Sequence, residues 1–388
     1  MSQARNFADL LASGTTITSD KIANNAITLD KIADNVVDGK ENLIINGDMA
    51  VAQRNSSSAV TVAHNSYQTV DRILFLISND GAFTSEQSST APDGFSNSLK
   101  LAVTTADTSI GATQYAYFDH RIEAQNLQHL NYGTALATDI TLSFWVRSSK
   151  TGTYCITVQK TDSTRYHFVK EYTIDTADTW EHKTITIAPD SNIKASGGAI
   201  TNDNGDGLRI SWFLSCGSTY ASATDNVWSS DTNDYATSNQ VNWLDSTSND
   251  FYLTGLKLEV GSTATSFLHE SYAENLAKCQ RYYYKHCEGI TQHVSLGDAH
   301  QTTQMDAVVH FPVTMRATPT LDANSGTGYW GVYITGVLRT SNAGWTLFRA
   351  MPTGTTIYNQ GFSSMTKGHA GRVIVSNASA YMAFNAEL

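Results

Sequence analysis

The sequence is poor in charge, in proline and in cysteine, and these shortages exclude several classes of protein. Only 16% of its 388 residues are charged, and it has 5 prolines and 4 cysteines. The cysteines lack the C-x-x-C spacing of a zinc ribbon, and they are too few for a disulfide scaffold in a chain of this length. We therefore expect reduced, mostly buried thiols.

Basic clusters and long apolar runs are also missing. The net charge is -11, whereas a nucleic-acid partner requires clustered Lys and Arg. No run approaches the roughly 20 apolar residues of a membrane span. The first residues, MSQARNFADLLASG, lack the apolar segment of a signal peptide. We therefore expect no nucleic acid, no membrane insertion, and assembly in a cytoplasm.

Familiar active-site motifs are absent as well. The chain contains no G-x-S-x-G, H-E-x-x-H, Walker or dinucleotide-binding glycine pattern. Histidines 286, 293, 300 and 310 follow no metal-ligand spacing. The sequence therefore predicts no catalytic residue, no metal and no cofactor, and we expect that the chain is not an enzyme.

What the sequence does contain is a long series of strand patterns. Between residues 42 and 267, short β-branched and aromatic runs alternate with turns, beginning with NLIIN at 42–46. In TLSFWVR, Leu142, Phe144 and Val146 alternate with Ser, Trp and Arg, which is the pattern of a half-buried strand. No strand is followed by a long helical pattern, which argues against a parallel α/β sheet. The sequence predicts an all-β protein whose body is a two-sheet sandwich over 41–269.

One helix interrupts the strands. In SYAENLAKCQRYYYKH, Ser271 and Glu274 form a capping-box pattern, and Leu276 and Cys279 share one face. The pattern predicts a short helix, the collar, over 270–287. The remaining residues, 288–388, predict a C-terminal β-sandwich, the tip.

The N-terminal segment repeats itself at an unusual period. The decapeptides ITSDKIANNA and ITLDKIADNV place Ile17, Ile22, Ile27 and Ile32 five residues apart, which suits neither a helix nor a strand. Three copies around a threefold axis could enclose these isoleucines in a narrow apolar core. We therefore expect a trimeric stalk over 15–40. A disordered linker is the alternative, because the intervening residues are polar and charged.

Two groups of aromatic residues are candidates for sugar binding, since aromatic faces stack on the C–H faces of sugar rings. The body group lies in the polar run DNVWSSDTNDYATSNQVNW, and the tip group follows residue 328. The candidates are Trp228, Tyr235 and Trp243 in the body, and Tyr329, Trp330, Trp345 and Tyr358 in the tip. The alternative is that the body group folds back over the sandwich.

Four sequence blocks carry a family resemblance. NLIINGDMAVAQR, DRI at 71–73, LSFWVRSSKTGTY and the long block from Phe251 to Lys285 resemble blocks of bacteriophage tail-fibre and related receptor-binding proteins. The resemblance implies a carbohydrate-binding jelly roll as the body, a homotrimer, and a virion-docking peptide at 1–14. It also implies a phage tail or nozzle protein and a host surface polysaccharide as partners, and a place in the virion tail after assembly in the bacterial cytoplasm.

These observations lead to one functional hypothesis and two alternatives. The hypothesis is a non-catalytic fibre protein that binds host glycan during adsorption, with the tip aromatics as first contacts because the tip lies farthest from the docking peptide. The first alternative is a capsid or neck decoration fibre without a receptor. The second is a tailspike glycan esterase or lyase.

Overall fold

The computed structural model describes residues 41–55 and 58–388. Residues 42–264 and 269–388 form one compact unit, and Glu41 and 265–268 belong to another. The predicted docking peptide 1–14 and stalk 15–40 lie outside the described residues. The prediction for Ile17, Ile22, Ile27 and Ile32 therefore stays a prediction.

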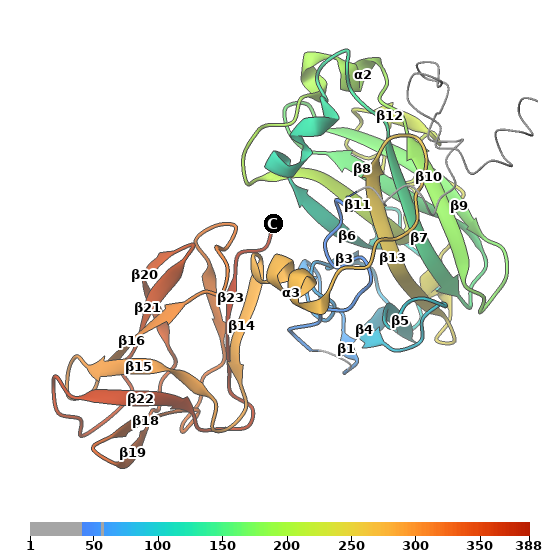
Figure 1. The fold of residues 1–388 in the computed structure, drawn as a ribbon. Helices are drawn as coiled ribbons and strands as arrows, with labels where there is room; N and C mark the ends of the chain where they lie inside the picture. The colour runs from blue at the N-terminus through green and yellow to red at the C-terminus, as the bar shows by residue number, and fades with distance from the viewer. Residues whose placement is uncertain (1–40, 56–57) are drawn as a thin grey trace, which may run out of the picture. The chain divides into compact units, whose positions relative to one another are not determined.

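The body is a sandwich of two antiparallel sheets (Figure 1). The first sheet has the order β1 (Val60–Thr61), β4 (Ala82–Ser88), β5 (Ser98–Thr105), β13 (Asp250–Val260), β7 (Ile140–Ser148) and β10 (Glu181–Ile187). The second has the order β12 (Val227–Ser229), β9 (Tyr166–Ile174), β8 (Gly152–Lys160), β11 (Asp206–Cys216), β6 (Tyr115–Glu123), β3 (Leu74–Ser78) and β2 (Ser66–Tyr67). The all-β prediction is confirmed.

Strand β7 shows how alternation builds the core of the body. Its residues Leu142, Phe144 and Val146 are fully buried, as their spacing predicts. Phe144 meets Trp212 of β11 edge-on, with 6.0 Å between ring centroids. The two sheets are therefore joined by interdigitating apolar side chains.

The run NLIIN is a turn, so the strand prediction for it is wrong. Asn46 and Met49 adopt positive φ angles of 62° and 57°. The Asn46 side chain donates to the backbone oxygen of Val51 and accepts from its N–H, both at 2.9 Å. Such local bonds from Asn compete with strand pairing and favour a left-handed turn.

The predicted helix exists but is shorter than the predicted collar. Helix α3 spans Tyr272–Gln280, and the Ser271–Glu274 capping box is present at its start. The last part of the collar is instead strand β14 (Tyr283–Glu288), which pairs with the C-terminal strand. Consecutive tyrosines favour strands, and pairing with a neighbour decides the conformation here. The other helical segments of the described ranges are short: η3 (Ala124–Leu130), α2 (Ser191–Lys194), η4 (Ser196–Gly198) and η5 (Trp243–Asp245).

The C-terminal residues form a second sandwich, as predicted. A sheet of β14, β23 (Tyr381–Asn385) and β17 (Thr320–Ala323) shares a core with a seven-stranded sheet. The latter has the order β19 (Val337–Thr340), β18 (Trp330–Ile334), β22 (Ala370–Val375), β15 (His293–Ala299), β16 (Met305–His310), β21 (Gly354–Asn359) and β20 (Thr346–Met351).

The outer face of this seven-stranded sheet carries a row of exposed apolar side chains. Strand pairing aligns Leu338 with Tyr333, Tyr333 with Arg372, and Arg372 with Leu296. The row continues on the next strands, where Val308 pairs with Thr356 and Thr356 with Phe348. Its apolar members, all exposed, are Leu296, Val308, Tyr333, Leu338 and Phe348. We call them the apolar row.

Candidate functional site

The four tryptophans predicted as sugar platforms are buried. Trp243 and Trp330 have no exposed surface, and Trp228 and Trp345 are 4% and 7% exposed. Indoles this deeply buried offer almost no face to a sugar, so the prediction of exposed platforms is wrong for these four residues, although Trp228 still lines two hollows of about 330 and 340 Å³. Their large apolar area is the physical reason, because burying it stabilises the sandwich cores.

Each indole is held by contacts within the body or within the C-terminal sandwich. Trp228 donates from Nε1 to the backbone oxygen of Ala188 at 2.9 Å, and Trp243 donates to that of Asp250 at 3.1 Å. Trp330 and Trp345 meet edge-on in the core of the C-terminal sandwich, with 6.3 Å between centroids. The alternative for the body group, folding back over the sandwich, is what the structure has.

The three tyrosines among the candidates are half-buried and lie apart from one another. Tyr235 packs on the outer face of the second body sheet, with its ring stacked 6.1 Å from that of Phe213. Tyr358 lies on β21 and meets Phe348 edge-on, and Tyr329 immediately precedes β18. None of the three tyrosines lines the hollow at Tyr67 and Tyr283 or either of the two hollows at Trp228.

One hollow of about 430 Å³ is lined by none of the predicted sugar-binding residues. Three tyrosines from distant parts of the sequence line it instead, so we call it the tyrosine cleft. Its lining residues are Arg54, Asn55, Asn65, Ser66, Tyr67, Gln68, Tyr283, Lys285, Glu288, Asp322, Tyr381 and Asn385.

One wall of the tyrosine cleft is built on Asp322 of β17. Its two carboxylate oxygens accept hydrogen bonds from the hydroxyls of Tyr283 and Tyr381, each at 3.0 Å. The two tyrosines lie on β14 and β23, which pair directly. The three-stranded sheet therefore fixes both rings and the carboxylate in one place.

A second wall, which adjoins the first at Tyr283, is formed by Arg54 and Tyr67. The Arg54 guanidinium lies 3.6 Å from the centroid of the Tyr283 ring and 5.3 Å from that of Tyr67. Lys285 donates from Nζ to the backbone oxygen of Arg54 at 2.8 Å and to Glu288 at 2.7 Å. Cations stacked on tyrosine faces are favourable contacts, and they hold this wall in place.

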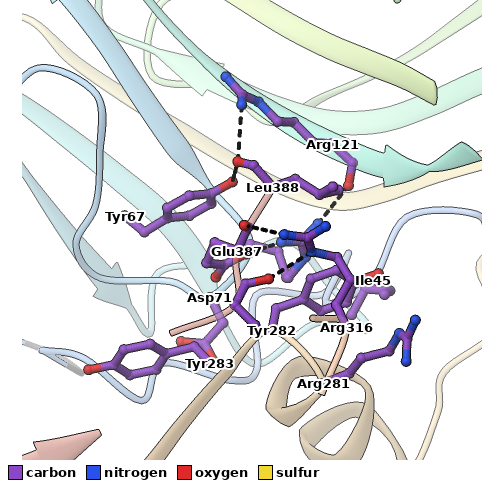
Figure 2. A network of polar contacts seen from close by, with 12 residues as sticks. Ile45, Tyr67, Asp71, Arg121, Arg281, Tyr282, Tyr283, Arg316, Glu387 and Leu388 are labelled. Carbon is purple, nitrogen blue, oxygen red and sulfur yellow. Dashed lines mark hydrogen bonds and ion pairs between the residues drawn. The ribbon is translucent and has the colours of Figure 1, made fainter. Parts of the chain in front are cut away.

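Tyr67 of the cleft also belongs to a buried network of polar contacts around Glu387 and Leu388 (Figure 2). The Glu387 carboxylate pairs with Arg72 and, at 3.2 Å, with Arg54. Arg121 and Tyr67 both point toward Leu388 and donate to its backbone oxygen at 3.0 and 3.2 Å. The network fixes Arg54 and Tyr67, so the cleft is lined by side chains that are already in position.

The tyrosine hydroxyls of the cleft stay protonated at neutral pH. Burial raises the pKa of Tyr67 and of Tyr283, and the nearby Glu387 and Asp322 carboxylates add to the effect. Burial, with Asp322 as a second cause, raises the pKa of Tyr381 to about 12. The cleft therefore combines aromatic faces, neutral hydroxyls, amides and carboxylates, which suits a ligand rich in hydroxyl groups.

A second charged group lies on the outer face of the second body sheet. Arg121 approaches Asp119 at 3.4 Å, and Arg209 approaches Asp206 at 2.5 Å. Burial raises the pKa of Asp119 to about 6, although the two arginines oppose the shift. Because each of the two carboxylates has an arginine beside it, the negative charges of this group are largely neutralised within the sheet.

No metal centre is found in the residues that the structure describes, since no three His, Cys, Asp or Glu residues are grouped to hold an ion. Across the same described ranges, no helix has both the length and the apolar character needed to cross a membrane.

Sequence reasoning missed the cleft because its parts are far apart in the chain. Tyr67, Tyr283 and Tyr381 are separated by more than 90 residues at each step. The one local signal was the run of three tyrosines at 282–284, which helical spacing assigned to α3. If the run is treated as a strand, its successive tyrosine rings are predicted to lie on opposite faces of the sheet.

No protein-family model and no curated protein sequence matches the chain. Similar solved structures include a Bacteroides thetaiotaomicron protein to which sugar binding is ascribed, at 12% identity, covering 57% of this chain and 100% of that chain, with a TM-score of 0.32. The enzymatically active domain of bacteriophage CBA120 tailspike protein 4 is 11% identical, covering 56% of this chain and 21% of that chain, with a TM-score of 0.29. A family 11 carbohydrate-binding module from Clostridium thermocellum is 9% identical, covering 54% of this chain and 99% of that chain, with a TM-score of 0.27. Values this low carry no argument about the function of this chain.

Proposed function

We propose that this chain is a non-catalytic tail-fibre protein of a bacteriophage, which binds a host surface polysaccharide in the tyrosine cleft. The proposal revises the sequence hypothesis in one respect. The binding site moves from the buried tryptophans to the cleft formed by Arg54, Tyr67, Tyr283, Asp322 and Tyr381.

The chemistry of the cleft is the observation that carries the proposal. Tyrosine rings can stack on the C–H faces of a sugar, and Asn55, Asn65 and Gln68 supply amide donors and acceptors for its hydroxyls. A volume of about 430 Å³ lies within the range of small-molecule sites. Because the walls are held by hydrogen bonds and stacked cations, little side-chain entropy is lost on binding.

The family resemblance supports the same place. The block that ends at Arg54 and the block that ends at Lys285 meet at the cleft. Gln53 donates from Nε2 to the backbone oxygen of Tyr283 at 2.7 Å, and Lys285 Nζ donates to that of Arg54 at 2.8 Å. Two of the four blocks on which the resemblance rests therefore contribute directly to one wall.

Binding without turnover is tested with the purified chain and envelope polysaccharide from candidate host bacteria. We expect saturable binding, with no new reducing ends and no released acetate. Polysaccharide cleavage or deacetylation that disappears on changing one carboxylate or serine would support the tailspike enzyme instead. Failure to bind any surface polysaccharide of the host, with the chain located on the capsid or neck of the virion, would favour the decoration fibre.

The apolar row supports the proposed homotrimer. Leu296 is 77% exposed on a sheet face beside Val308 and Phe348, and surfaces of this kind are commonly buried by association. Burying each side chain contributes about 1.5–3 kcal/mol. We expect Leu296→Asp with Val308→Asp to shift the trimer to monomer in light scattering, with the fold retained.

Leu136 provides the matched control for the trimer experiment. It is 75% exposed on the body, far from the apolar row in sequence, so Leu136→Asp is expected to leave the trimer intact. A wild-type chain that is monomeric at micromolar concentration would contradict the homotrimer. In the same proposal, residues 1–14 dock to a tail or nozzle protein and place the chain in the virion tail.

A further inference from the structure

Asp322 differs from the other carboxylates around the tyrosine cleft because it lacks a cationic partner. Glu387 pairs with Arg54 and Arg72, and Glu288 pairs with Lys285. Within the described residues, no Lys, Arg or His nitrogen lies within 4.0 Å of Asp322, which accepts only from two neutral tyrosine hydroxyls. The cleft therefore contains one carboxylate whose charge is not neutralised by a neighbouring cation.

The Asp322 carboxylate keeps the capacity to accept further hydrogen bonds. Each of its oxygens accepts one tyrosine hydroxyl at 3.0 Å, whereas an ionised carboxylate has about four acceptor positions in all. Asp322 is only partly buried and lines the hollow. A donor that enters the cleft can therefore reach it without breaking either tyrosine bond.

The cleft already stacks cations on tyrosine rings. Arg54 lies over Tyr283 at 3.6 Å, and the Lys285 ammonium lies 6.0 Å from the centroid of Tyr381. Both cations already form ion pairs, Arg54 with Glu387 and Lys285 with Glu288. An added anion would thus find no unpaired cation in the cleft, whereas an added ammonium would find both a carboxylate and aromatic rings.

We infer that the tyrosine cleft selects saccharides that carry an unsubstituted, protonated amino group, with Asp322 as the ion-pair partner of that group. The inference rests on the proposed glycan-binding function and names the class of sugar. Acidic sugars are disfavoured because Asp322 and Glu288 would repel them. N-acetylated sugars are disfavoured because a neutral amide cannot form the ion pair.

The test compares a glucosamine oligosaccharide with its N-acetylated counterpart of equal length, by calorimetric titration at about pH 5.5, where an ordinary carboxyl is ionised and an amine is protonated. We expect the wild-type chain to bind the free-amine oligomer about tenfold more tightly or better, a factor that corresponds to one ordinary charged contact. In Asp322→Asn the preference is expected to disappear. The variant can remain folded, because an Asn oxygen accepts one tyrosine hydroxyl and its amide donates to the other.

A control variant removes the same charge away from the cleft. Asp298 is exposed on β15, so Asp298→Asn is expected to keep the full preference. Equal binding of both oligomers by the wild-type chain, tighter binding of the N-acetylated one, binding of neither, or a preference that survives Asp322→Asn would each overturn the inference. The polysaccharide titration decides the proposed function separately, because a chain that binds host polysaccharide but not the free-amine oligomer loses only the amine selectivity.

Discussion

The core of the C-terminal sandwich and the tyrosine cleft beside it are both rich in aromatic residues, yet they use them in opposite ways. In the core, Trp330 is fully buried and meets Trp345 edge-on. In the cleft, the hydroxyls of Tyr283 and Tyr381 bind one carboxylate while their rings line a hollow. The first arrangement serves packing, and the second leaves polar and aromatic surface available for a ligand.

The difference between the two regions lies in the polar end of the side chain. Tryptophan has more apolar area than tyrosine and one N–H donor, so a polar stretch of sequence around it does not prevent its burial. Tyrosine can bury one part of its ring and keep its hydroxyl in a hydrogen-bond network. Aromatic composition alone therefore does not distinguish a core from a binding site.

The largest expected effect comes from removing a core aromatic. Trp330→Ala is expected to lower the free energy of unfolding by about 3–5 kcal/mol, through lost apolar burial and the cavity left behind. Denaturant unfolding measures this loss. A change below about 1 kcal/mol would show that Trp330 is more accessible than its burial indicates and would return it to the list of ligand contacts.

A buried carboxyl outside the cleft, that of Asp119 on the body sheet, gives the next largest effect. Burial raises the pKa of Asp119 to about 6, so the folded state holds this proton more tightly than the unfolded state does. Its contribution to stability is therefore present at low pH and is lost as the pH rises from about 4 through about 6. The loss is at most about 3 kcal/mol.

Asp119→Asn isolates this contribution. Between about pH 4 and pH 7 the wild type is expected to lose stability relative to the variant, because only the wild type has the Asp119 carboxyl. Unfolding curves at several pH values measure the shift. A difference that stays constant across this range would contradict the raised pKa.

The smallest effect is expected inside the cleft. Tyr381→Phe removes one hydrogen bond to Asp322 but keeps the ring, and we expect it to lower the unfolding free energy by about 0.5–1.5 kcal/mol. Tyr358→Phe, on the outer face of the seven-stranded sheet, is the matched variant and should change stability less. A Tyr381→Phe loss as large as that of Trp330→Ala would mean that the cleft is part of the core.

Much of the fold was predictable because it depends on local patterns. Alternation placed Leu142, Phe144 and Val146 in a buried strand, and the Ser271–Glu274 pair marked the start of α3. Local patterns failed where a distant strand decided the outcome. Tyr283–Glu288 continues the helical spacing of α3 in sequence, but pairing with β23 makes it a strand.

The candidate site was not predictable to the same degree. Its walls come from Arg54, Tyr67, Asp322 and Tyr381, and only the folded chain brings them together. The sequence did supply the two blocks that end at Arg54 and Lys285, without showing that they meet. The isolated aromatic residues drew attention because of their polar surroundings, which do not reveal whether a side chain folds inward.

The most direct test of the account is polysaccharide binding by two sets of variants, each confirmed to be folded. One set combines Tyr67→Ala with Tyr381→Ala in the cleft, and the other changes the half-buried candidates Tyr235, Tyr329 and Tyr358 to Ala. The account predicts that the cleft set loses about tenfold or more in affinity, while the second set binds like the wild type. The expected loss follows because each aromatic contact contributes about 0.5–1.5 kcal/mol beyond its buried area. Retained binding in the cleft set together with lost binding in the second set would contradict it.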